Sequence, residues 1–229
     1  MLAIIPARSG SKTLKNKNIL KFAGKPLIHW TILAALKSKK IDKIIISTDS
    51  KKISKICKKI SKKVLVPFLR PKYLAKDNSA AIDSYLFTLD KLEKKGKKIK
   101  DFIVLLPTSP LRNYKDIDNA INYFERKNAE TVISCVKTKP FTWYLKREKN
   151  EKINEVFRNK ALVNRQEYEN FLIPNGAIYI FNKDALKRKN SYYTNKSYAY
   201  IMSKEKSIDI DDKHDFKIAE KLFLNINKT

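Results

Sequence analysis

Residues 2–18 read LAIIPARSGSKTLKNKN, a short apolar run that passes directly into a basic loop of small residues. Pro6 ends the apolar run, and Ser9, Gly10 and Ser11 follow within the loop. Backbone N–H groups in such a loop form a concave site for anions, and neighbouring cationic side chains neutralise bound phosphate. The stretch therefore predicts a phosphate-binding turn after a first β-strand.

The loop does not follow either of the common glycine-rich phosphate motifs. The GxxxxGK[ST] spacing is absent, and so is GxGxxG. An exposed basic loop in a basic protein is the alternative interpretation. The position of the loop, after the first strand of an α/β chain, favours phosphate binding by Arg8, Lys12 and Lys17.

Strand and helix patterns alternate along the rest of the chain. Apolar runs predict strands at residues 2–5, 43–47, 64–66, 102–106, 131–134, 175–181 and 198–202. Helical spacing of apolar residues predicts helices after Pro26, after a cap at Ser50, over 78–95, over 116–126 and at the end of the chain. We expect one α/β domain over residues 1–229, with a doubly wound, mostly parallel, Rossmann-like sheet covered on both faces.

A second motif, PTSPLR at residues 107–112, follows a buried strand. Ligands of such sheets bind beyond the carboxyl ends of the strands, so this loop is expected to face the ligand. Its two prolines make it rigid, and Thr108 and Ser109 offer hydroxyl groups. Bonding of these hydroxyls to the backbone of a turn is the alternative.

The third motif is SIDID at residues 207–211, which reads as a short strand. Alternation places Asp209 and Asp211 on one side, with Ile208 and Ile210 toward the core. Paired carboxylates suit Mg²⁺, which takes one or two carboxylates together with substrate phosphates. The alternative is that Asp211 or Asp212 caps the last helix.

The composition limits which other classes of function the chain can have. The net charge of +27 fits an anionic partner, but the abundance of Lys, Ile and Asn also fits compositional bias, and no nucleic-acid module is apparent. The two cysteines form no CxxC pair, so neither a zinc site nor a disulfide framework is expected. No apolar stretch reaches membrane-spanning length and no signal sequence is apparent, so we expect a cytoplasmic protein without membrane or specific nucleic-acid partners.

Taken in order, these motifs resemble the CMP-N-acylneuraminate cytidylyltransferase family, the CMP-sialic acid synthetases. The resemblance covers nearly the whole chain and rests on residues 4–12, 16–18, 47–49, 69–77, 107–112, 174–180 and 200–211. It implies a Rossmann-like nucleotidyltransferase in which the anomeric hydroxyl of a nine-carbon acidic sugar attacks the α-phosphate of CTP. Pyrophosphate leaves, Mg²⁺ assists, and no covalent enzyme intermediate forms.

The resemblance also implies roles for matching residues. Arg8, Lys17 and Asp211 are expected to be catalytic, and Asp209 and Asp211 to hold the metal. Nucleotide binding is expected from Arg8, Ser9, Gly10, Ser11, Lys12, Lys17, Asn18 and Arg70. Sugar binding is expected from Leu106, Thr108, Ser109, Arg165, Asn175 and Tyr179. An insertion at about 137–185 is expected to form a homodimer contact and a wall of the sugar pocket, with Arg165 reaching the partner's active site.

Several positions depart from the family pattern. Leu106, Thr142 and Ile173 stand where the family often has Gln, Lys and a basic residue, so the sugar side loses polar contacts. On the nucleotide side, Ala81 and Thr13 replace a common Ser and Gly. Either other residues bind N-acetylneuraminate, or the substrate is a related sugar of the legionaminate type. An eight-carbon acid, a nucleic-acid-binding α/β protein and a non-catalytic relative are the less favoured alternatives.

Overall fold

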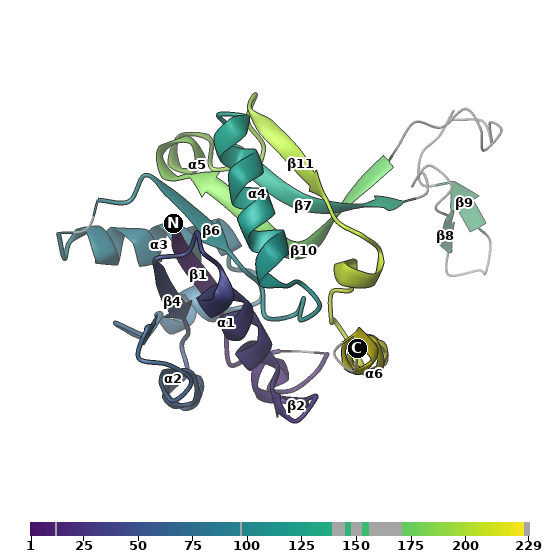
Figure 1. Ribbon diagram of the computed structural model, residues 1–229. Coiled ribbons are helices and arrows are strands. Elements are labelled where there is room, and N and C mark those ends of the chain that lie inside the picture. Colours follow the sequence, from purple (N-terminus) through teal and green to yellow (C-terminus); the bar gives the residue numbers. More distant parts are fainter. Residues whose placement is uncertain (12, 97, 139–144, 148–152, 156–170, 227–229) are drawn as a thin grey trace.

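The computed structural model describes residues 1–11, 13–96, 98–138, 145–147, 153–155 and 171–226. Its main sheet has seven strands in the order β11–β7–β10–β6–β1–β4–β5. Their bounds are β1 Leu2–Pro6, β4 Lys43–Ser47, β5 Val64–Leu65, β6 Asp101–Val104, β7 Thr131–Thr138, β10 Phe171–Asn182 and β11 Ser197–Ile201. The alternating strands and helices of the sequence therefore build one continuous sheet (Figure 1).

The sheet is mostly parallel, as the sequence predicts. Strand β1 pairs in parallel with β4 and β6, β4 with β5, and β11 with β7. Only β10 runs against its neighbours β6 and β7 within this sheet. From β1 the chain moves outward through β4 to β5 and then returns to β6 on the other side of β1. The strand order thus reverses between β1 and β6, which is where open α/β sheets bind ligands.

Helices cover both faces of the sheet. Helices α1 (Leu27–Lys37), α2 (Lys51–Lys58) and α4 (Tyr114–Arg126) share a buried cluster with Ile5, whereas α3 (Ala81–Glu93) and α5 (Lys183–Lys189) share another with Ile4. Figure 1 shows α1 and α4 in front of the sheet and α3 behind it. Successive strand residues point to opposite faces of the sheet, so the adjacent Ile4 and Ile5 pack in two different buried clusters. This explains why the predicted strands are unbroken apolar runs.

Helices α2 and α4 begin at capping residues that the local sequence supplies. The Ser50 side chain accepts a hydrogen bond from the Ile53 backbone N–H, which confirms the predicted cap. Asn113 and Asp116 form a capping box at the start of α4. Such caps satisfy backbone N–H groups that have no partner inside the helix. The PTSPLR loop consequently leads into α4 at a fixed place.

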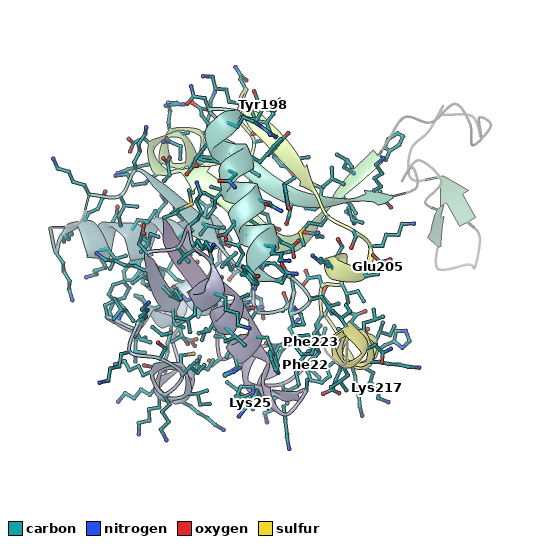
Figure 2. All side chains as sticks on the ribbon, viewed as in Figure 1. Phe22, Lys25, Tyr198, Glu205, Lys217 and Phe223 are labelled. Atoms are coloured by element: carbon teal, nitrogen blue, oxygen red, sulfur yellow. The ribbon has the colours of Figure 1, made fainter. Side chains whose placement is uncertain are left out.

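The C-terminal helix α6 (Lys213–Ile226) lies across the short hairpin of β2 (Lys21–Phe22) and β3 (Lys25–Pro26). The Phe22 ring meets those of Phe216 and Phe223 edge-on at centroid distances of 5.3 and 5.4 Å. Figure 2 shows Phe22 and Phe223 side by side between these elements. This third cluster ties the end of the chain to the loop that follows β1.

The predicted strand at residues 207–211 is wrong. The chain there forms a 3-10 helix, Glu205–Ser207, followed by residues outside regular secondary structure. Residues 208–211 pair with no strand, and the Ile210 backbone N–H instead donates to the Thr108 carbonyl oxygen, in the loop after β6, at 2.9 Å. The inward direction of the isoleucines is confirmed, since Ile210 is fully buried and Ile208 packs against the same cluster.

The predicted insertion at about 137–185 overlaps the main sheet. Strand β10 is an interior strand of the main sheet, and α5 packs on that sheet. Only the residues between β7 and β10 are therefore left for an insertion. Within that segment, β8 (Leu145–Arg147) and β9 (Ile153–Glu155) form a two-stranded antiparallel sheet. Arg165 and Thr142 lie outside the described residues, and the dimer contact stays a prediction. Among the helices that are described, none is long and apolar enough to cross a membrane.

Replacing Phe22 by alanine tests the role of α6. Phe22 is fully buried and contacts two rings of that helix, so Phe22→Ala is expected to lower the free energy of unfolding by about 3–5 kcal/mol. Urea denaturation followed by circular dichroism measures this loss. The control is Tyr73→Ala, because Tyr73 is 61% exposed and its loss should change stability by no more than about 0.5 kcal/mol. Equal effects of the two substitutions would contradict this account of the packing.

Candidate active site

A cavity of about 520 Å³ opens beyond the carboxyl ends of β1 and β6. Its walls include Pro6 at the end of β1 and Leu106 to Thr108 after β6. This is the point where the strand order reverses. The parallel pairing of β1 and β6 brings both loops to one edge of the sheet.

The basic loop, residues 7–18, forms one side of this cavity. The Arg8 guanidinium lies 2.9 Å from the Asp77 carboxylate and donates a 3.5 Å hydrogen bond to the Ala75 carbonyl oxygen. Ser9 donates to Asp49 from its backbone N–H and its hydroxyl, at 2.8 and 2.6 Å. Arg8 and Ser11 line the cavity. Carboxylates outside the loop therefore neutralise Arg8 and orient Ser9.

Lys17 connects the basic loop to the end of the chain. Its Nζ donates to the Ile210 carbonyl oxygen at 2.6 Å and to Asp211 Oδ1 at 3.3 Å. The Thr13 hydroxyl donates to the Asp211 carbonyl oxygen at 2.5 Å. Thr13, which stands where the family that the sequence resembles usually has glycine, thus joins the basic loop to the segment that carries Asp209 and Asp211.

Two further residues of the predicted nucleotide site line the same cavity. Asn18 is buried, and its side-chain amide donates to the Arg8 carbonyl oxygen at 3.0 Å. Arg70 is 6% exposed, and its Nε has no hydrogen-bond partner among the described residues. Burial lowers the pKa of Arg70. A ligand that accepts a hydrogen bond from this buried guanidinium would be favoured there.

The two carboxylates have different environments. Asp211 is exposed and lines the cavity, whereas Asp209 is half-buried and its Oδ1 has no hydrogen-bond partner among the described residues. Burial raises the pKa of the Asp209 carboxyl; Asp211 also raises it, while a Thr108 hydrogen bond and Lys17 lower it. The backbone of Gly176 has a φ of +72°, and a Cβ there would lie 2.7 Å from Asp209 Oδ2. Gly176 therefore leaves room for this carboxylate.

These oxygens fit a hard divalent cation. A buried carboxylate oxygen without a donor, beside a second carboxylate, is the kind of ligand that Mg²⁺ binds. Within the described ranges, no group of three or more His, Cys, Asp or Glu residues is arranged to hold a metal. Two carboxylates would be sufficient, since Mg²⁺ usually completes its shell with water and substrate phosphates. The alternative role of helix capping falls to Asp212, whose Oδ1 accepts from the backbone of His214 and Asp215.

The predicted sugar residues divide into two groups. Leu106, Thr108 and Tyr179 line the cavity. Ser109 and Asn175 are buried and lie outside its lining. Ser9, Gly10 and Asp209 are also outside the lining, and Lys12 and Arg165 are outside the described residues.

Asn175 belongs to a buried hydrogen-bond network. Its Oδ1 accepts from the Ser134 hydroxyl at 2.6 Å and from the Ala177 backbone at 3.2 Å. Its Nδ2 donates to the Ser207 hydroxyl at 2.8 Å. Asn175 therefore joins β7 and β10 to the segment that leads to Asp209.

Sequence reasoning missed two aromatic residues of the cavity, Tyr85 and Tyr192. Tyr85 comes from α3 and Tyr192 follows α5, and both side chains line the cavity. Burial raises the pKa of both residues and of Tyr179, so the three phenols remain protonated at neutral pH. The apolar spacing of α3 is a weak signal for Tyr85, and the sequence around Tyr192 carries none.

Comparison with known proteins agrees with this geometry. Residues 2–227 match the family described as Cytidylyltransferase. The chain is 37% identical over 219 residues to an N-acylneuraminate cytidylyltransferase of Streptococcus agalactiae, covering 94% of this chain and 51% of that protein. It is 33% identical over 226 residues to the CMP-N,N'-diacetyllegionaminic acid synthase of Legionella pneumophila, covering 97% and 95%.

A solved structure has the same fold. The structure of CMP:2-keto-3-deoxy-manno-octonic acid synthetase complexed with CTP superposes with a TM-score of 0.71 at 14% identity, covering 98% of each chain. This chain spans about half the length of the N-acylneuraminate cytidylyltransferases that it matches. The family match over nearly all its residues, together with the full-length similarity to the Legionella protein, shows that the chain belongs to the cytidylyltransferase family.

Proposed function

We propose that this protein transfers CMP from CTP to the anomeric hydroxyl of a nine-carbon acidic sugar and releases pyrophosphate. The observation that carries the proposal is the cavity beyond the carboxyl ends of β1 and β6, where Arg8 pairs with Asp77 and Lys17 with Asp211. Such a site offers cations for a triphosphate and carboxylates for a metal ion. The relatives named for N-acylneuraminate and legionaminate activation support the same reaction.

Binding of CTP would exchange the partners of the two cations. In the structure Arg8 pairs with Asp77 and Lys17 with Asp211. A triphosphate carries more negative charge than either carboxylate, so it would draw both side chains toward its oxygens. Ser11 and the backbone of the basic loop would add hydrogen bonds, and Asn18 and Arg70 would contact the nucleoside.

The transfer itself needs orientation and charge rather than a covalent enzyme intermediate. The anomeric oxygen would form a bond to the α-phosphorus, and the bond from that phosphorus to the bridging oxygen would break. Pyrophosphate would leave with the electron pair, held by Arg8 and Lys17. Asp211, exposed at the cavity, would accept the hydroxyl proton. Asp209 and Asp211 would hold Mg²⁺, which when bound supplies positive charge beside the phosphates.

The lining of the cavity favours a sugar with fewer polar contacts than N-acetylneuraminate. Leu106, which stands where the family often has Gln, lines the cavity in the same apolar cluster as Tyr179. The leucine side chain leaves a hydroxyl group of a fully polar sugar without a partner, which costs specificity for that sugar. A legionaminate-type sugar is therefore the second candidate, and the full-length similarity to the Legionella synthase supports it. We also propose a homodimer in which Arg165 completes the sugar site of the partner.

The test is pyrophosphate release from CTP and Mg²⁺ with N-acetylneuraminate, legionaminate, pseudaminate and the eight-carbon acid. We expect release with a nine-carbon sugar. Asp209→Asn should reduce turnover on the order of a thousandfold, because it removes a metal-binding charge. Asp90→Asn, an exposed change on α3, is the control and should leave turnover unchanged. A folded protein that fails to bind CTP would overturn the proposal.

Gly176→Ala tests whether the backbone of β10 positions the Asp209 carboxylate. The added Cβ would displace Asp209, so kcat should fall on the order of a hundredfold and Mn²⁺ binding to the CTP complex should weaken. Turnover assays and electron paramagnetic resonance of Mn²⁺ measure the two effects. The control is Gly24→Ala, which has a similar φ of +82° but no atom within 4 Å of the added Cβ. If both variants lose activity equally, backbone strain rather than the carboxylate contact is responsible.

Leu106→Gln tests the substrate preference of the cavity. A glutamine amide would hydrogen-bond a polar group of the sugar, so kcat/KM for N-acetylneuraminate should rise roughly tenfold relative to legionaminate. The same sugar panel measures the ratio. Leu65→Gln, on the edge strand β5 and outside the cavity, should leave it unchanged. An unaltered ratio in Leu106→Gln would remove this residue from the sugar site.

A further inference from the structure

Asp49 follows directly after β4, at the same edge of the sheet as the basic loop that follows β1. Strands β1 and β4 pair in parallel, and the Ala7 backbone N–H extends this ladder by donating to the Ser47 carbonyl oxygen at 2.9 Å. Two residues further along both chains, the same register brings Ser9 to Asp49. The pairing of the strands therefore places this carboxylate beside the start of the basic loop.

Both hydrogen-bond donors of Ser9 are bound by the Asp49 carboxylate. The backbone N–H donates to Asp49 Oδ1 at 2.8 Å, and the hydroxyl donates to Asp49 Oδ2 at 2.6 Å. Hydrogen bonds to an ionised acceptor are roughly twice as strong as neutral ones, and a pair of them fixes the orientation of the donor. Arg8 and Ser11 line the cavity, whereas Ser9 does not. Ser9 therefore faces Asp49 and not the cavity.

The two residues after Ser9 have no such support. Neither Gly10 nor Ser11 forms a hydrogen bond with another described residue. A Cβ added to Gly10 would meet no atom within 4 Å, and glycine has the greatest conformational freedom of all residues. The backbone N–H groups of Gly10 and Ser11 are thus available to an anion. Their position depends on how firmly Ser9 is held.

The far end of the loop is held separately. Thr13 and Lys17 bind the backbone of Ile210 and Asp211, in the segment that precedes α6. These contacts leave the part of the loop around Gly10 unsupported. The bond from Ser9 to Asp49 is consequently what ties the first half of the loop to the sheet.

Asp49 also lies close to the nucleotide side of the cavity. The Arg70 backbone N–H donates to the carbonyl oxygen of Thr48, the residue before Asp49, at 2.8 Å. Burial lowers the pKa of the Arg70 guanidinium, and the charge of Asp49 opposes this shift. Asp49 therefore acts on two parts of the cavity, on the basic loop through hydrogen bonds and on Arg70 through its charge.

We propose that Asp49 is a positioning residue for triphosphate binding, which holds Ser9 so that the N–H groups of Gly10 and Ser11 are directed at the phosphates before CTP binds. The inference rests on the proposed function, because it requires the basic loop to bind the triphosphate. Ser9 acts through Asp49 and does not contact the nucleotide. Ordering a free loop on binding costs conformational free energy, and a loop that is already anchored avoids most of this cost.

Two substitutions of Asp49 separate its hydrogen bonds from its charge. Asp49→Ala should weaken CTP binding roughly tenfold, because both bonds to Ser9 are lost. Asp49→Asn should stay within about threefold of the wild type, since an amide can still accept the Ser9 N–H and bond its hydroxyl. Both variants lose the same charge beside Arg70, so they should bind cytidine equally. Calorimetric titration with CTP and saturation-transfer NMR with cytidine measure these affinities, and equal CTP affinity of the two variants would overturn the proposal.

Ser9→Ala distinguishes an anchor from a direct contact with the nucleotide. This change removes the hydroxyl bond and keeps the backbone bond, so CTP binding should weaken about threefold in the wild-type chain. In the Asp49→Ala chain it should have no further effect, because its partner is already absent. The same loss in both chains would mean that Ser9 contacts the nucleotide, and the proposal would be wrong.

Asp118→Ala is the matched control. Asp118 accepts hydrogen bonds from the Ser38 hydroxyl and from the Lys40 backbone N–H, and it lies outside the cavity. CTP binding should change by no more than about twofold, while urea denaturation shows whether both alanine variants are folded. An equal loss of CTP affinity in Asp118→Ala would assign the effect to general destabilisation and reject the anchor. A wild-type chain that fails to bind CTP would overturn the proposed function as well, whereas unchanged CTP binding in Asp49→Ala would reject the anchor alone.

Discussion

The parallel pairing of β1 with β4 and β6 is the constraint on which the other features depend. Ile4 and Ile5 are both fully buried, on opposite faces, so β1 has to lie inside the sheet between two layers of helices. The basic loop then leaves the sheet at the point where the strand order reverses. The cavity follows from this placement, because the loops after β1 and β6 diverge there.

The segment that carries Ile210 and Asp211 contacts the loop that follows β1. Ile210 is fully buried beside Phe22, and this anchors the segment that carries the two carboxylates. Lys17 and Thr13 then bind the backbone of Ile210 and Asp211 across almost the whole length of the sequence. The apolar cluster fixes the position of this segment, and the hydrogen bonds from Lys17 and Thr13 fix its orientation. Neither would be sufficient alone, since Asp211 itself is exposed.

Buried polar groups connect the candidate active site to the body of the sheet. Asn175 joins Ser134 to Ser207, and Arg112 holds the carbonyl oxygens of Leu106 and Ala177. These contacts surround the irregular pairing of β10 with β7, where the register shifts between Pro174 and Tyr179. Such networks are costly to leave incomplete, so they hold one arrangement of the loops.

The sequence alone predicted the seven strands of the main sheet and the helices α1 to α4 and α6, because apolar period, caps and turn residues act over short distances. It also placed Leu106 and Tyr179 in the cavity through the family resemblance. Only the tertiary structure decided that residues 207–211 are not a strand, because the backbone there lies against the loop that carries Thr108 and not against a strand. Likewise, Asn175 became a buried connector, Tyr85 and Tyr192 met at the cavity, and Gly176 made room for Asp209. Each of these contacts joins residues far apart in the chain, and no local pattern encodes a distance between them.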